Sequence, residues 1–183
     1  MSRKLAFAVL TGLMGAALLH IIIILALPNF TGRDAYTRVV AEGPEHSFHS
    51  LGDTPDAAGL SNLDPYIKVA VCHFDVTTQP IRLLAGFSPG FWSVAIYDSD
   101  SNEVFSMNDR TSVAGVLDVL AASPVQLSRI RKSVPPSLAQ SIIVELKEPT
   151  GYAVLRAMAP QPSFEQAARE FLGDALCIPF EGY

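Results

Sequence analysis

The polar residues best suited to chemistry gather just after an aromatic, strand-like run. Trp92 and Tyr97 belong to that run, and Asn108, Asp109 and Arg110 follow the next one. Amide, carboxylate and guanidinium groups at the end of a strand suit a small polar or anionic ligand. Turn chemistry explains the same composition, with Asn108 in an Asx-type turn and Arg110 paired to an acidic residue. The five residues are therefore ligand-binding candidates, and the structural alternative stays open.

Three motifs imitate catalytic or metal sites, and each lacks the context that its chemistry requires. Gly86–Gly90 has the letters of a nucleophile elbow, but a β-rich run follows it and every histidine precedes its serine. Asp98–Asp109 imitates a calcium loop, yet Glu103 stands where glycine makes the sharp turn. His46 and His49 lie in an irregular segment with no apparent third ligand. We therefore predict no catalytic residue, no metal and no cofactor.

The chain has two cysteines, Cys72 and Cys177. Outside the cytoplasm such a pair is more often a disulfide than a metal site or a redox motif. A bond would tie the first strong strand to the carboxy-terminal tail. Closing a loop of about 100 residues would contribute about 4–5 kcal/mol in the chain-entropy model. We predict this disulfide; the alternative is two buried thiols that never meet.

The amino-terminal run from Leu5 to Leu27 carries no charged side chain, and Arg3 and Lys4 precede it. About 20 apolar residues in a helix span a bilayer core, where lipid offers the backbone no other hydrogen-bonding partner. The sequence therefore predicts a membrane anchor that contacts the lipid bilayer through residues 5–27. The helix is expected to end at a proline and the polar residues after it, namely Pro28, Asn29, Thr31 and Gly32.

The charges beside the anchor predict its orientation. Basic residues stay on the cytoplasmic side, so the amino terminus is expected inside and the rest of the chain outside, in the periplasm of a Gram-negative cell. A cleaved signal peptide is the alternative. Signal peptides have shorter apolar regions and an A-x-A-like cleavage site, which Ile24-Leu25-Ala26 matches poorly. We therefore predict an uncleaved anchor in the bacterial inner membrane.

Small residues recur at every fourth position of the anchor, at Ala8, Gly12 and Ala16, and His20 continues the series. Such a helix-packing face lets two helices approach closely, and ionisable groups in membranes often face a partner. The alternative is a single anchor with His20 neutral near the outer interface. The single anchor is favoured, because motifs of this kind are weak.

The part of the chain after the anchor is acidic and large enough for one domain. About 150 residues remain, enough to bury a hydrophobic core. Without Arg3 and Lys4, eleven of the 13 basic residues remain against 18 acidic ones, which gives a net charge near −7. That balance argues against nucleic acid as a partner and against a basic patch on anionic lipid.

Short strand-like runs with turn signals between them dominate residues 67–183. Strands are expected at 67–76, 81–85, 91–97, 103–107, 116–120, 142–146 and 152–158, the last two flanking a hairpin signal at 148–151. Capping boxes beginning at Ser123 and Ser163 predict two helices, and a third is expected after Thr31. We predict an α+β, mainly β fold, with a transmembrane helix at 1–30, a short helix and irregular segment at 31–66, and a β-sandwich-like domain at 67–183.

Three segments resemble the short, membrane-anchored members of domain-of-unknown-function family 1254 from alphaproteobacteria, namely Ile67–Asp75, Phe91–Asp98 and Val104–Thr111. The similarity covers most of the chain, including the anchor and a terminal cysteine like Cys177. The resemblance implies a β-sandwich and an inner-membrane location, and it brings no established activity or catalytic residue. Longer relatives carry a second domain of unknown function, family 1214. The resemblance therefore implies a separate envelope protein with that domain as a partner.

The sequence as a whole predicts a bitopic inner-membrane protein whose periplasmic domain binds or scaffolds a partner in the cell envelope. The alternative is an enzyme or enzyme subunit that acts on a small organic or envelope substrate together with a second-domain partner. Because no catalytic set is evident, the binding function is favoured over the enzyme. Alanine replacement of Asn108 and Arg110 would separate the two if it removed a phenotype while the fold and partner binding persisted.

Overall fold

The computed structural model describes residues 2–31, 34–88 and 90–182, with the backbone alone described for residues 28–31. The chain forms two units, Met1–Asp34 and Ala35–Tyr183. Each unit is described by itself below.

The first unit is a single helix, α1 (Ser2–Thr31). Its stretch Ser2–Leu27 is long and apolar enough to cross a membrane, and its large apolar side chains are exposed. The helix ends at Thr31, within the segment of Pro28 and the polar residues after it where its end was predicted. The φ angle of proline is itself helical, so the backbone can complete a last turn after Pro28.

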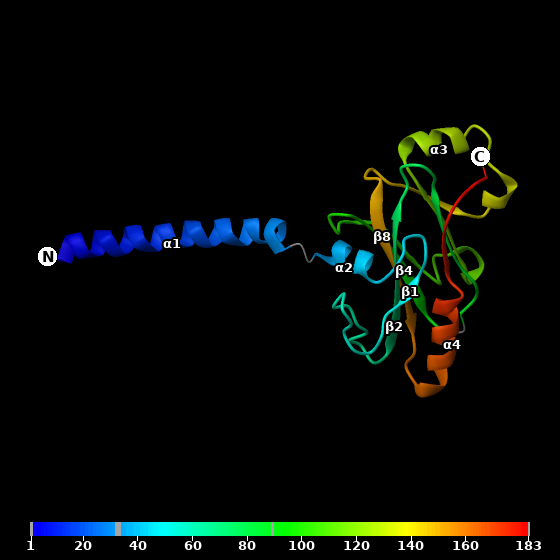
Figure 1. Ribbon diagram of the computed structural model, residues 1–183, viewed down its shortest axis with the longest axis horizontal. Coiled ribbons are helices and arrows are strands. Elements are labelled where there is room, and N and C mark those ends of the chain that lie inside the picture. Colours follow the sequence, from blue (N-terminus) through cyan, green and yellow to red (C-terminus); the bar gives the residue numbers. More distant parts are fainter. Residues whose placement is uncertain (1, 32–33, 89, 183) are drawn as a thin grey trace. The chain divides into compact units, whose positions relative to one another are not determined.

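The second unit consists of two β-sheets that face each other (Figure 1). Sheet A has the order β1-β2-β8-β4-β5 and is antiparallel throughout; its strands are β1 (His49–Ser50), β2 (Ile67–Asp75), β8 (Thr150–Met158), β4 (Trp92–Asp98) and β5 (Glu103–Asn108). Sheet B has the order β7-β6-β3-β9, with β6 and β7 parallel; its strands are β7 (Ile142–Glu145), β6 (Leu117–Ala122), β3 (Ile81–Ala85) and β9 (Leu176–Pro179). The predicted α+β, mainly β fold is confirmed.

The main hydrophobic core lies between the two sheets. Because side chains alternate along a strand, every second residue of each strand points into this space. Phe74 and Leu155 come from sheet A, and Leu83 and Val119 come from sheet B. Each of these four residues is at most 1 % exposed. Trp92 packs on Phe171 at one end of the core, with ring centroids 6.0 Å apart.

Short helices cover the sheets unevenly. They are α2 (Ala35–Ala41), α3 (Pro124–Ile130) and α4 (Pro162–Gly173), with the 3-10 turns η1 (Val113–Gly115) and η2 (Pro136–Leu138). On the outer face of sheet B, Leu127 and Ile130 of α3 pack on Leu120. On the outer face of sheet A, Val39 of α2 packs with Val71 and Val154. Figure 1 shows α3 and α4 near opposite ends of the sheets.

The segment 35–66, expected to be a connection, belongs to the same compact unit as the strands. Tyr36, Leu51 and Leu60 pack against the apolar cluster on the outer face of sheet A. The predicted short helix is present as α2, which begins at Ala35. The side chain of Thr31, its predicted cap, lies outside the described residues.

The two predicted capping boxes have different outcomes. Ser123 accepts a hydrogen bond from the Gln126 backbone, and the Gln126 side chain accepts one from the Ser123 backbone, so the first box is confirmed. The second, at Ser163, is wrong, because α4 already begins at Pro162 with Gln161 as its N-cap. Proline suits the first helical position, since its φ angle is helical and it has no N–H group to satisfy.

The predicted hairpin at 148–151 is also wrong. β7 pairs with β6 in sheet B, whereas β8 pairs with β2 and β4 in sheet A. The connection therefore crosses between the layers, and the backbone N–H of Val76 donates to the Pro149 carbonyl at 2.8 Å. Strand β9 was not predicted.

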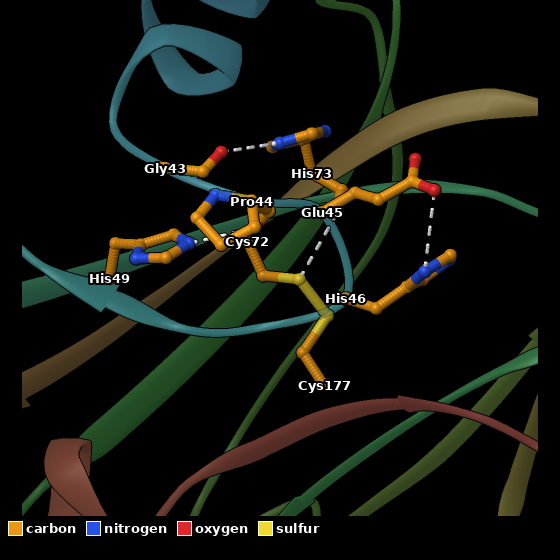
Figure 2. Close-up of a disulfide and its surroundings, with 8 residues drawn as sticks. All are labelled: Gly43, Pro44, Glu45, His46, His49, Cys72, His73 and Cys177. Atoms are coloured by element: carbon orange, nitrogen blue, oxygen red, sulfur yellow. Dashed lines mark hydrogen bonds and ion pairs between the residues drawn. A yellow bond between two sulfur atoms is a disulfide. The ribbon is translucent and has the colours of Figure 1, made fainter.

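Cys72 on β2 and Cys177 on β9 form a disulfide, so the predicted bond is confirmed (Figure 2). Their Cα atoms are 6.6 Å apart, and both side chains are buried. Because β2 belongs to sheet A and β9 to sheet B, the bond joins the two layers across the core. The two cysteines are 105 residues apart in the sequence.

Candidate functional site

The two aromatic candidates lie on opposite faces of sheet A. Trp92 is fully buried in the core, and its Nε1 donates to the Gly115 carbonyl at 3.1 Å. Its role in the structure is therefore packing. Tyr97 lies on the outer face and stacks on Tyr152, with ring centroids 5.0 Å apart. Only Tyr97 of this pair borders a surface that a ligand can reach.

The polar candidates form a turn at the end of β5. The Asn108 side-chain oxygen accepts from the backbone N–H groups of Arg110 at 3.0 Å and Thr111 at 3.2 Å. This is the Asx-type turn that composition allowed. One oxygen of Asp109, Oδ1, is buried and has no hydrogen-bond partner among the described residues. Arg110 is exposed and makes no ion pair with any residue that the structure describes.

The sheet register brings Asn108 beside residues that sequence analysis did not name. Ser93 on β4 stands opposite Arg156 on β8 on one side and opposite Asn108 on β5 on the other. Because these three share one face of the sheet, their side chains lie in one row. Further along the same face, Tyr97 stands opposite Glu103.

This row borders an open pocket of about 270 Å³ on the outer face of sheet A. We call it the Arg156 pocket. Its lining residues are Ser93, Val94, Ala95, Tyr97, Glu103, Ser106, Met107, Asn108, Thr111 and Arg156. The structure thus brings Tyr97 and Asn108 together and leaves the other three candidates out of the lining.

The charges of the Arg156 pocket favour an anion at one end. Arg156 is half-buried, and no carboxylate of the described chain lies within 4.0 Å of it. A guanidinium offers five N–H donors, and the hydroxyl of Ser93 stands beside it. Glu103, the acidic residue of the lining, already accepts from the Ser106 hydroxyl at 2.7 Å. A carboxylate or similar anion is the group that Arg156 is equipped to hold.

Arg156 gave one signal that sequence analysis overlooked. It is the only charged side chain in β8, a strand that is otherwise apolar or small. A lone arginine in such a run must either find a partner on the sheet face or remain available to one. Its neighbours, however, come from β4 and β5, which lie far away in the sequence.

The remaining polar candidates do not assemble into a catalytic or metal-binding group. Ser88 Oγ accepts from the Gly90 backbone at 3.3 Å. Ring nitrogens of His73 and His49 lie 3.0 Å from the Gly43 carbonyl and 2.8 Å from the Pro44 carbonyl (Figure 2). His46 lies 3.6 Å from Glu45. Within residues 2–31, 34–88 and 90–182, no three His, Cys, Asp or Glu side chains are placed to hold a metal ion.

Comparison with known proteins shows similarity at the level of the fold. No family model and no curated protein matches the chain. The VPA0106 protein from Vibrio parahaemolyticus has a similar structure, with a TM-score of 0.60 and 14 % sequence identity. The match covers 79 % of this chain and 33 % of that one, so the chain spans about a third of its length. An uncharacterised protein from Burkholderia cenocepacia matches with a TM-score of 0.49 and 9 % identity, over 83 % of this chain and 42 % of that chain.

Proposed function

We propose that this chain is a bitopic inner-membrane protein whose periplasmic domain binds an acidic group of a partner protein through the Arg156 pocket. The length and composition of α1 support the anchor. Arg3 and Lys4 before it support a cytoplasmic amino terminus. The disulfide supports an oxidising compartment for the domain.

The observation that carries the binding function is the guanidinium of Arg156, which forms no ion pair with any residue in the described part of the chain. Half-burying a cation is unfavourable, because the cation loses part of its hydration shell, unless another interaction compensates for the loss. On the outer face of sheet B, by contrast, Arg82 donates to both carboxylate oxygens of Asp118. An arginine kept without a carboxylate therefore supports a role outside the fold.

The shape of the pocket supports a protein rather than a small molecule as the occupant. Small-molecule sites usually enclose most of the ligand surface, whereas this pocket lies on one sheet face. Strand β5 forms the free edge of sheet A beside it, and Val104 on that edge is exposed. Protein interfaces combine such flat surfaces with an arginine anchor. A carboxylate of the partner would accept two parallel hydrogen bonds from Arg156.

Site-specific cross-linking tests this proposal. A photoreactive residue at Ser106, an exposed residue of the pocket lining, should capture one partner in intact cells, and the same residue at exposed Ser128 on α3 should not. The first partner to examine is a chain with the family 1214 domain, which the sequence resemblance implies. Arg156→Glu should abolish the capture, because a carboxylate would then face a carboxylate. Equal capture by Arg156→Glu and the unmodified chain would contradict the proposal.

Reporter fusions test the compartment separately. Alkaline phosphatase fused after the domain should be active, and a fluorescent protein that matures only in the cytoplasm should stay dark. The reverse result would contradict the proposed orientation.

A further inference from the structure

A second pocket, of about 240 Å³, lies between α4 and the segment that joins β1 to β2. We call it the Lys68 pocket. Its lining residues are Ser50, Leu51, Gly52, Asp53, Asn62, Lys68, Val69, Arg169 and Leu172. It shares no lining residue with the Arg156 pocket. The proposed function therefore neither requires nor explains it.

Lys68 is a buried cation in this pocket. Its residue exposure is 8 %, and the hydrogen bond described for its ammonium group goes to Asp53 Oδ1 at 3.1 Å. An ammonium group has three donors, so two remain for other acceptors. Burial of a charge with so few partners is unfavourable, and a further anionic acceptor would relieve it.

Asp53, the partner of Lys68, stands at the mouth of the pocket. Its side chain is 65 % exposed, whereas the Lys68 side chain is 10 % exposed. The hydrogen bond and charge of Lys68 lower the pKa of Asp53, and Asn62 and Arg169 add to this effect. The pocket thus already attracts one carboxylate, and that carboxylate can turn out into water without moving a buried group.

The rest of the lining is fixed and partly apolar. Asn62 donates to the Leu51 carbonyl at 2.6 Å and accepts from the Val69 backbone at 3.0 Å, so its position is set by two main-chain bonds. The side chain of Leu172 offers apolar surface on the core side of β2, whereas the side chains of Leu51 and Val69 pack in the cluster on the outer face of sheet A. The two cations of the lining are Lys68, which pairs with Asp53, and Arg169, whose Nη2 donates to Glu165 Oε2 at 3.1 Å on the exposed face of α4.

We propose that the Lys68 pocket binds a small organic carboxylate with an apolar body, whose carboxylate replaces Asp53 at Lys68 and faces Arg169. The pocket, of about 240 Å³, is smaller than a typical site for a drug-sized ligand and suits a small molecule. The apolar body lies against Leu172. Asp53 occupies the carboxylate position when the ligand is absent.

Calorimetric titration of the full-length chain in detergent tests the ligand class. Sodium benzoate and sodium butyrate should bind saturably in the millimolar range or tighter, against a background of sodium chloride at equal ionic strength. Sodium phosphate should bind more weakly, because it gains nothing from the apolar surface of Leu172. Carboxylate binding no stronger than that of chloride, or phosphate binding tighter than benzoate, would overturn the proposal.

Substitution of Asp53 gives the sharpest test, because the proposal predicts a gain. Asp53→Asn removes the internal competitor, so benzoate affinity should rise about tenfold, which corresponds to one charge-assisted hydrogen bond. If the Lys68–Asp53 pair only fastened the loop, the same change would leave affinity unchanged or weaken it, and either result would overturn the proposal.

The cation variants complete the test. Lys68→Met keeps the aliphatic stem and should abolish binding. Should this variant fail to fold, Arg169→Gln replaces a side chain that is 61 % exposed and should weaken binding severalfold. Arg156→Gln and the exposed control Arg129→Gln should leave benzoate affinity unchanged, which separates this site from the proposed partner surface. Loss of binding in all variants alike, or in none, would overturn the assignment.

Discussion

Two arginines project from the outer faces of the two sheets, and their surroundings are opposite. On sheet B, Arg82 donates from Nε and Nη2 to both oxygens of Asp118, at 3.0 and 2.9 Å, and from Nη2 to the Ser137 carbonyl at 2.8 Å. Its guanidinium also lies 5.9 Å from the ring centre of Phe180. On sheet A, Arg156 has no carboxylate within 4.0 Å among the described residues.

The difference follows from how each face is covered. The outer face of sheet B carries α3 and η2, and Arg82 links η2 to the sheet through Ser137. The cover on sheet A, formed by α2 and the following segment, packs around Val71 and Tyr152, and β4 and β5 carry the open pocket. An arginine on a sheet face that is packed against helices stabilises the fold, whereas an arginine on an open part of a sheet face can donate hydrogen bonds to a partner.

Removal of the disulfide should have the largest effect on stability, because both faces depend on the two sheets staying together. Cys72→Ala with Cys177→Ala should lower the free energy of unfolding by about 4–5 kcal/mol in the chain-entropy model. Urea unfolding of the full chain, followed by the fluorescence of the single tryptophan, Trp92, measures this. Equal urea midpoints for the oxidised and the reduced protein would show that the bond adds nothing.

Arg82→Gln should have the next largest effect. The substitution leaves Asp118, whose side chain is 20 % exposed, without its bidentate partner, so the free energy of unfolding should fall by about 2–3 kcal/mol. The double variant with Asp118→Asn should recover part of the loss. Arg129→Gln, on exposed surface, is the matched control and should stay within about 0.5 kcal/mol. A loss of stability no larger than that of the control would show that the pair of Arg82 with Asp118 does not stabilise the fold.

The cover on sheet A should respond to pH. Burial and the neighbouring Asp56 carboxyl raise the pKa of Glu42, which directly follows α2. The folded state therefore holds this proton more tightly than the unfolded state, so stability gained below the unfolded pKa is lost as pH rises through the folded pKa. Glu42→Gln should remove this dependence and slow amide exchange in α2 at neutral pH. Equal amide exchange rates in α2 for Glu42→Gln and the unmodified chain would contradict this prediction.

Arg156→Gln should have the smallest effect on stability and the largest on binding. Since the guanidinium has no carboxylate partner within the described chain, the free energy of unfolding should change by no more than about 0.5 kcal/mol. Partner capture from Ser106 should be lost. Destabilisation as large as that of Arg82→Gln would show that Arg156 serves the fold, and the two arginines would no longer differ.

Much of the local structure could be predicted from the sequence, because it depends on neighbouring residues. The expected strand at 81–85 matches β3, and the capping box at Ser123 forms as expected. Predictions from short sequence motifs were wrong at two places where a neighbouring residue or the pairing of strands decided the structure. Pro162 moved the start of α4 ahead of Ser163, and the turn residues at 148–151 form a crossing between layers instead of a hairpin.

The candidate site was only partly predictable, because its residues meet through strand pairing. Tyr97 and Asn108 were named from composition, and both line the Arg156 pocket. Trp92 was named for the same reason and lies in the core, since the pleat turns its side chain to the inner face. Arg156 was missed, because nothing within its own strand indicates which residues stand beside it.

The sequence by itself determined the apolar helix, the mainly β composition of the domain and the pairing of its two cysteines, because each rests on residue type, short spacing or the absence of any other partner. Tertiary structure alone decided which arginine is paired and where the two pockets lie. The physical reason is that register and layer packing set the distance between charges from different strands, and that distance determines whether a charge stabilises the fold or remains free to bind.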